Sequence, residues 1–126
     1  MADDDPIIVD ILAKRLSHEG YEIVKAFNGQ EALNKIKSES PDVIILDLTM
    51  PKKDGFEVLK ELRENPPSDK WQPVIIVSGR NELTDVRKGY TLEADHYLVK
   101  PCSVDEILKS IKLMIALIPK RKLPSE

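Results

Sequence analysis

The sequence predicts an α/β fold built on a parallel sheet, with helices on both faces of that sheet. Two short runs of apolar, mostly β-branched residues, 43–46 and 74–77, are typical of strands buried on both faces. Amphipathic segments with helical spacing alternate with these runs, as expected for a parallel α/β sheet. Each run ends in a polar residue, and such sheets bind ligands beyond the carboxyl ends of their strands.

Helices and strands are expected to alternate along the whole chain. The first helix has Asp5 as N-cap and Pro6 in its first turn, and Gly20 suits its C-terminal cap. The next elements are a strand at 21–27, a helix after Asn28-Gly29, a strand at 43–47, a helix carrying Phe56 to Leu62, a strand at 74–78, a helix at about 82–92 and a strand at 96–99. Ser103 caps a last helix that Pro119 ends, with an apolar stripe of Val104, Ile107, Leu108, Ile111 and Ile115.

Length and composition indicate one soluble domain. We place it at 1–118 of the 126 residues, with 119–126 as a tail or the start of a linker. The net charge of -3 gives no reason to expect direct nucleic-acid binding, and no segment is long and apolar enough for a membrane span. Cys102 is the only cysteine, which excludes an internal disulfide, and the acidic start is unlike a signal peptide. We therefore expect a cytoplasmic protein.

Polar side chains stand where the predicted strands end. Asp47, Ser78 and Lys100 follow three of the strands, and Asp3-Asp4 precede the first helix. A carboxylate at such a position can attack a phosphoryl group and form an acyl phosphate. That transfer requires positive charge around the phosphoryl oxygens and little covalent help from the protein.

The remaining residues supply what this chemistry needs. Two acids beside Asp47 offer the oxygen ligands that Mg²⁺ prefers, Lys100 offers a positive charge, and Ser78 offers a hydroxyl donor. Gly79 has no side chain and leaves the approach open. Taken singly, each feature has a simpler interpretation, such as a helix cap, a turn or a surface lysine. Their combination in one fold indicates phosphoryl chemistry.

In order and spacing, these motifs resemble the receiver domain of two-component response regulators over nearly all of the chain. The matching motifs are Asp3-Asp4 with Asp5-Pro6, the Ile-Ile-Leu-Asp47 strand with Met50-Pro51 and Asp54-Gly55, Ser78-Gly79, and Tyr97-Leu98-Val99-Lys100-Pro101. Spacings of 43 residues from Asp4 to Asp47, 31 on to Ser78 and 22 on to Lys100 make a chance match very improbable. The resemblance implies a flavodoxin-like, doubly wound parallel sheet with strand order 2-1-3-4-5.

The resemblance also implies a role for each matching residue. Asp47 would be the phosphoacceptor, and Asp3 and Asp4 would bind Mg²⁺ with it. Thr49 would offer its backbone carbonyl to the metal and its side chain to the water that attacks during hydrolysis. The other implied roles are Ser78 as the switch hydroxyl, Tyr97 as the aromatic side chain that moves inward behind it, and Lys100 as the phosphate-binding lysine, with a cis Lys100-Pro101 bond.

The function implied is that of a phosphorelay module. A histidine kinase or a histidine phosphotransfer protein would phosphorylate Asp47, and the resulting population shift would regulate an output domain or protein. The responsive face would comprise 82–92 and 104–115. We expect no enzymatic turnover beyond self-phosphorylation and slow self-dephosphorylation.

Two alternatives belong to other functional classes. A haloacid-dehalogenase-like phosphatase also uses an aspartyl nucleophile at a strand end, but it requires a second acid two residues on, where this chain has Thr49. A phosphorylation-independent pseudo-receiver would keep only the interaction face. The acceptor, the hydroxyl and the lysine argue against that interpretation, whereas the missing first strand argues for it.

The chain departs from the family pattern at two places. Only Met1 and Ala2 precede Asp3, where receivers carry a central strand, so that strand is absent or truncated. Because its loss would expose backbone hydrogen-bonding groups, strand exchange between two copies in a homodimer is one expected consequence. Glu93 stands where the family commonly has glycine, which predicts a strained turn.

Overall fold

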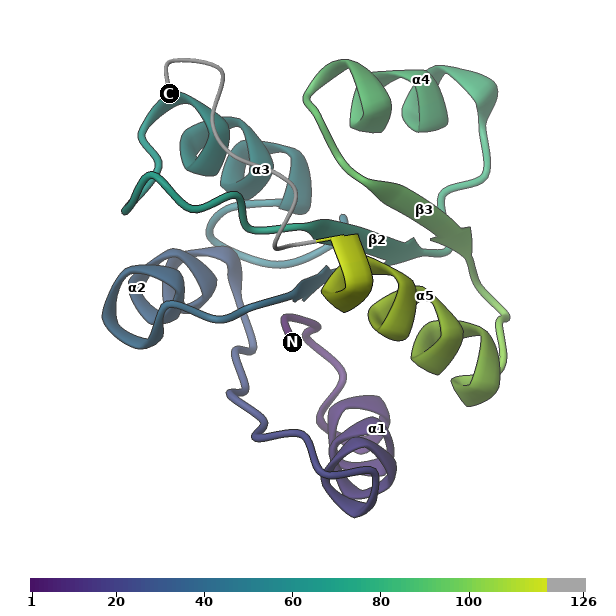
Figure 1. The fold of residues 1–126 in the computed structure, drawn as a ribbon. Helices are drawn as coiled ribbons and strands as arrows, with labels where there is room; N and C mark the ends of the chain where they lie inside the picture. The colour runs from purple at the N-terminus through teal and green to yellow at the C-terminus, as the bar shows by residue number, and fades with distance from the viewer. Residues whose placement is uncertain (118–126) are drawn as a thin grey trace.

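The computed structural model describes residues 1–117, and this part of the chain contains three parallel strands and five helices (Figure 1). The elements are α1 (Pro6–His18), α2 (Gly29–Glu39), β1 (Ile44–Leu46), α3 (Gly55–Glu64), β2 (Val74–Ser78), α4 (Leu83–Thr91), β3 (His96–Val99) and α5 (Val104–Leu117). The strands lie in the order β1-β2-β3. No helix among the described residues has the length and apolar character required to cross a membrane. The predicted helix end at Pro119 and the tail at 119–126 lie outside the described residues.

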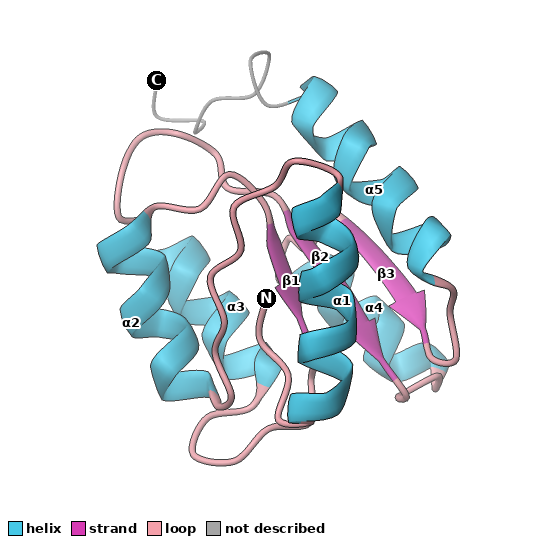
Figure 2. Cartoon of the chain, turned by 90° about the horizontal axis from the view of Figure 1, so that it is seen from below, coloured by secondary structure: helices cyan, strands magenta, loops and turns pink. Residues whose placement is uncertain are grey.

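Helices cover both faces of the sheet, as the sequence predicts (Figure 2). Alternate strand residues face opposite sides, so Leu46 and Ile76 pack with α2 and α3, and Ile45 and Ile75 pack with α1 and α5. The register sets Ile45 opposite Ile75. Two apolar clusters therefore sandwich the sheet and fix the positions of its strand ends.

Local signals in the sequence account for the helix ends. Asp5 caps α1 by accepting the backbone N–H groups of Ile7 and Ile8, and Asn28 caps α2. Asp54 and Glu57 form a reciprocal capping box at the start of α3. After α1 the chain turns at Gly20, whose φ of 95° is readily accessible only to glycine.

The predicted strand at 21–27 is wrong. These residues form one isolated parallel bridge, from Ala26 to Ala2, and no regular strand. Alternating polar and apolar side chains indicate which face of an extended segment is buried. A regular strand also requires a neighbouring segment that forms a continuous ladder of backbone hydrogen bonds with it. Ala2 bridges to Leu46 on its other side, so a short stub occupies the position between 21–26 and β1.

Three finer predictions have mixed outcomes. Ile115 is 38% exposed, and Met114 faces the core instead, so the predicted stripe of α5 is wrong at its end. Glu93 has a φ of 70°, which confirms the strained turn. The Lys100-Pro101 peptide bond is cis, also as predicted.

Candidate functional site

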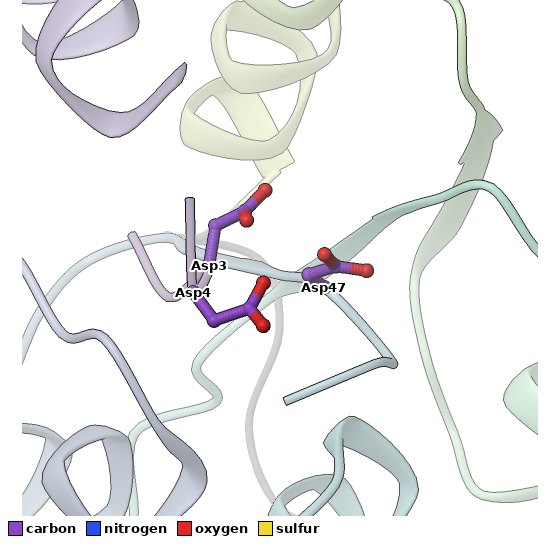
Figure 3. A group of neighbouring side chains, drawn as sticks. All are labelled: Asp3, Asp4 and Asp47. Atoms are coloured by element: carbon purple, nitrogen blue, oxygen red, sulfur yellow. The ribbon is translucent and has the colours of Figure 1, made fainter. Parts of the chain in front are cut away.

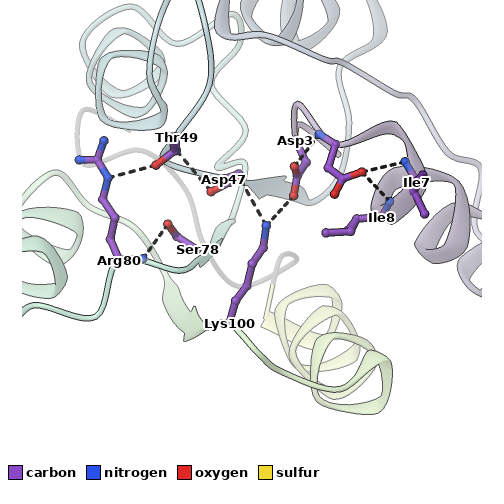
Figure 4. Close-up of polar contacts among 9 residues, drawn as sticks. Asp3, Ile7, Ile8, Asp47, Thr49, Ser78, Arg80 and Lys100 are labelled. Atoms are coloured by element: carbon purple, nitrogen blue, oxygen red, sulfur yellow. Dashed lines mark hydrogen bonds and ion pairs between the residues drawn. The ribbon is translucent and has the colours of Figure 1, made fainter.

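The carboxyl ends of the parallel strands bring the predicted residues to one edge of the sheet. Asp47 follows β1 directly, Ser78 is the last residue of β2, and Lys100 follows β3. Asp47 and Ser78 are buried, with 7% and 1% of their surface exposed. Figure 4 shows these side chains converging from their separate strands.

Backbone hydrogen bonds fix Asp3 and Asp4 beside Asp47, although no regular strand precedes them. The Ala2 N–H donates to the Ile45 carbonyl at 2.8 Å, and the Ala2 carbonyl accepts the Asp47 N–H at 2.9 Å. On the other side, the Asp3 N–H donates to the Ala26 carbonyl at 3.1 Å. These bonds hold the start of the chain between two segments and set the position of both acids.

The three acids form a compact cluster (Figure 3). Carboxylate oxygens of Asp3, Asp4 and Asp47 all lie within 4.8 Å of one another. Asp3 and Asp47 are buried, and Asp4 is exposed. Hard oxygen donors at this spacing fit a magnesium ion, which prefers carboxylate and carbonyl oxygens and retains several waters. The acids of the predicted metal site are therefore together and suited to that ion.

Lys100 neutralises part of the acidic charge. Its Nζ donates to Asp3 Oδ2 at 2.8 Å and to Asp47 Oδ2 at 3.3 Å. The other oxygen of Asp47, Oδ1, accepts the Thr49 backbone N–H at 3.3 Å. Both oxygens of the candidate acceptor thus have a donor, and the lysine lies where it can also reach a phosphoryl oxygen.

The surroundings of Asp47 disfavour the ionised form of its carboxyl group. Burial raises the pKa of Asp47 and the charge of Asp3 adds to the rise, while Lys100 and the Thr49 N–H only partly oppose it. Burial by itself would lower the pKa of Lys100, but its bonds and charge interactions with Asp3 and Asp47 outweigh burial and raise it. Burial is therefore the main reason that the ionised form of Asp47 is disfavoured.

Ser78 and Tyr97 share one backbone partner. Ser78 Oγ accepts the Arg80 N–H at 3.2 Å, and the Tyr97 hydroxyl donates to the Arg80 carbonyl at 2.6 Å. Tyr97 is only 8% exposed, so it points inward, and burial raises the pKa of its hydroxyl. The two predicted switch residues are thus joined through the segment that follows β2.

Two residues at the site were missed as functional candidates. Arg80 Nε donates to Thr49 Oγ1 at 3.2 Å, across the cluster from Lys100 (Figure 4). Gly55 lies against the backbone of Asp47, where an added Cβ would stand 2.4 Å from the Asp47 carbonyl oxygen. The motif Asp54-Gly55 marks that close approach in the sequence, whereas no local pattern marks Arg80. At Gly79 an added Cβ would meet no atom within 4 Å, as expected for an open approach.

Comparison with known proteins gives a consistent result. The family model for the response regulator receiver domain matches residues 1–112. The chain is 36% identical over 115 residues to the alkaline phosphatase synthesis transcriptional regulatory protein PhoP of Bacillus subtilis, covering 91% of this chain and 47% of that protein. It is 34% identical over 112 residues to the transcriptional regulatory protein TrcR of Mycobacterium tuberculosis, covering 89% of this chain and 42% of the relative. The chain thus spans less than half the length of these relatives.

Solved structures of single domains match over almost their whole length. The CheY-like response regulator receiver domain protein of Methanospirillum hungatei gives a TM-score of 0.87 at 29% identity, covering 94% of this chain and 93% of that one. The receiver domain of the Francisella response regulator 1452 gives 0.84 at 34% identity, covering 91% and 93%. These matches confirm the predicted α/β receiver-domain fold, which is CheY-like. The chain belongs to the response regulator receiver domain family of two-component systems.

Proposed function

We propose that this chain is a phosphoacceptor module in which Asp47 takes a phosphoryl group from the phosphohistidine of a histidine kinase or a histidine phosphotransfer protein. A carboxylate oxygen of Asp47 would form a bond to phosphorus, while the bond from phosphorus to the imidazole nitrogen breaks and its electron pair stays on the ring. The observation that carries the proposal is the joint placement of Asp47, Lys100 and the acid pair at one sheet edge.

Each side chain has a defined task in that transfer. Lys100 supplies positive charge to a phosphoryl oxygen, and it needs only to exchange part of its contact with Asp47 to do so. Asp3 and Asp4, with a carboxylate oxygen of Asp47 and the Thr49 carbonyl, would hold Mg²⁺. Bound there, the ion supplies charge neutralisation and orients the phosphoryl oxygens.

Signalling would follow from a shift between two conformations. Ser78 Oγ would turn toward the phosphoryl group, giving up the Arg80 N–H, and the contact of Tyr97 with the same residue couples the two side chains. The face formed by α4, β3 and α5 would then change its surface. Leu83, Tyr90 and Val99 are large apolar side chains that this face exposes, which suits contact with an output domain or protein.

The test is the intact mass of the chain after incubation with acetyl phosphate, with and without Mg²⁺. A Mg²⁺-dependent gain of one phosphoryl group is expected, and Asp47→Asn should abolish it. Asp69→Asn removes the same charge at an exposed loop position and serves as the matched control. A variant at Asp47 that is labelled in normal yield would refute the acceptor assignment. A folded wild-type chain that gains no mass would favour the phosphorylation-independent interaction module instead.

A further inference from the structure

A buried ionic cluster lies at the amino ends of β2 and β3, at the opposite edge of the sheet from Asp47. Arg63, in the last turn of α3, donates from Nη2 to Asp95 Oδ2 at 3.1 Å, and the two side chains are only 9% and 3% exposed. Asp95 also accepts the Trp71 indole N–H at 3.1 Å and the Val74 N–H at 2.9 Å. The Arg63 guanidinium lies 3.9 Å from the centre of the Trp71 ring. The end of α3, the segment before β2 and the start of β3 are thus joined at one point.

The same arginine fixes the turn that follows α4. Arg63 Nε donates to the Glu93 carbonyl at 3.1 Å, and Nη1 donates to the Gln72 carbonyl at 2.8 Å. Glu93 has a φ of 70°, a left-handed conformation that favours glycine, so this residue needs support from its surroundings. The Ala94 N–H donates to the Gly89 carbonyl at 3.0 Å, which ties the turn to the last turn of α4. Arg63 therefore holds the carboxyl end of α4 through the backbone of Glu93.

The amino end of α4 is held less firmly. Glu82 is the N-cap and its side chain makes no capping hydrogen bond, whereas side chains cap α1, α2 and α3. Leu83 in the first turn is 62% exposed, and Gly89 is the only buried residue of α4. An added Cβ at Gly89 would stand 3.0 Å from the Ile76 side chain, so α4 packs tightly on the sheet near its carboxyl end.

The switch residues contact the amino end of α4. The Tyr97 hydroxyl donates to the carbonyl of Arg80, two residues before the N-cap, and the Arg80 guanidinium lies 4.0 Å from Asp85 in the first turn. A change in the loop after Ser78 therefore reaches the start of α4 directly. The contacts of Arg63 lie at the opposite end of β2 from Ser78.

We propose that Arg63 is a positioning residue that anchors the carboxyl end of α4, so that the helix pivots at Glu93 and its first turn makes the movement that a partner detects. The anchor stands on contacts of the unphosphorylated chain, and its part in signalling rests on the proposed phosphoacceptor function. A pivot at one end converts a local change beside Ser78 into a displacement of Leu83, while the packing at Gly89 is kept.

Amide hydrogen exchange, followed by NMR in the chain without a phosphodonor, tests the anchor. Arg63→Lys keeps a positive charge beside Asp95 but loses the planar fork of donors. The protection of the Ala94 amide should fall by about tenfold relative to the Ala32 amide in α2, because a hydrogen bond from a charged group to the turn is lost. A merely structural role would lower the protection of both amides alike.

Two further variants complete this test. Arg15→Lys alters an arginine that is ion-paired with Asp105 at the surface, and as the matched control it should leave the ratio of the two amides unchanged. If Arg63→Lys does not fold, Arg63→Met combined with Asp95→Asn removes both charges of the buried pair and leaves neither unpaired. That double variant should show the same selective loss at Ala94.

The second measurement follows the same amides after incubation with acetyl phosphate and Mg²⁺. In the wild type, exchange should change at Val86 in the first half of α4 and stay the same at Ala94. In Arg63→Lys the change should extend to Ala94, because the turn no longer resists the movement of the helix.

Three outcomes overturn the inference. Equal loss of protection at Ala32 and Ala94 in Arg63→Lys would leave Arg63 a general structural role only. A change at Ala94 as large as that at Val86 in the phosphorylated wild type would exclude a pivot at this end of α4. A wild-type chain that takes no phosphoryl group would overturn the proposed function and the signalling role of the pivot, whereas the exchange of Ala94 in the unphosphorylated chain still decides the anchor.

Discussion

Neutralising the side chain of Asp47 should stabilise the metal-free protein, although this carboxylate is buried and hydrogen-bonded. The relevant substitution is Asp47→Asn, which keeps an oxygen to accept the Thr49 N–H. One carboxylate oxygen from each of Asp3, Asp4 and Asp47 lies within 4.8 Å of the others, and two charges 4.8 Å apart at an effective dielectric constant near 20 repel by about 3.5 kcal/mol. Asp47 meets two such charges, in Asp3 and Asp4.

Lys100 offsets most of this repulsion. At 3.3 Å it attracts the Asp47 carboxylate by about 5 kcal/mol under the same assumption. Because Asp4 is exposed and its repulsion is screened, the charge interactions nearly cancel, and burial of the carboxylate is the main cost of ionised Asp47. We expect Asp47→Asn to raise the free energy of unfolding by about 1–2 kcal/mol, and the urea midpoint by roughly 0.5–1 M.

Urea unfolding in the presence of EDTA measures this effect at pH 7. Trp71, the only tryptophan of the chain, is 7% exposed and provides the fluorescence signal. Mg²⁺ should stabilise the wild type and act much less on Asp47→Asn, because binding to the native state adds to stability. Asp69→Asn is the control for a change of net charge at an exposed position.

The pH dependence has a definite sign. Burial raises the pKa of Asp47, so the ionised carboxylate costs folding free energy at any pH above that value. The advantage of Asp47→Asn should be complete at neutral pH and should disappear as the pH falls through the pKa of Asp47. If Asp47→Asn is no more stable than the wild type in EDTA at pH 7, the inferred cost of burying the ionised carboxylate is wrong.

Three further predictions concern the same region. Lys100→Met should raise the pKa of Asp47 and Asp3→Asn should lower it, because their charges shift it in opposite directions; carboxyl ¹³C NMR measures both, and shifts of the same sign would contradict the assignment. Gly55→Ala should cost about 2–4 kcal/mol in urea unfolding, since its Cβ would overlap the Asp47 carbonyl, whereas Gly79→Ala meets no atom within 4 Å and should cost far less. Strand exchange between copies predicts association that increases with concentration in sedimentation experiments, and a folded monomer at all concentrations would refute it.

The sequence predicted the convergence of Asp47, Ser78 and Lys100 because topology alone determines it. Asp47 and Lys100 each follow a strand and Ser78 ends one, and parallel strands end at the same edge of a sheet. The contacts of Arg80 could not be predicted in this way. A long side chain in a loop reaches several neighbours, and only the observed conformation of that loop selects Thr49 among them.

One explanation covers two results: the predicted strand at 21–27 did not form, and the predicted acids Asp3 and Asp4 do lie beside Asp47. Alternation within 21–27 describes which side chains face the core, but a ladder forms only where a neighbour supplies backbone partners, and here that neighbour is Ala2. The position of Asp3, by contrast, requires only a few backbone hydrogen bonds. The Ala2 N–H donates to Ile45, the Ala2 carbonyl accepts the Asp47 N–H, and the Asp3 N–H donates to Ala26; these bonds are enough to set Asp3 beside Asp47. The position of the three acids therefore depends on a few backbone hydrogen bonds, whereas a regular strand depends on hydrogen bonds along its whole length.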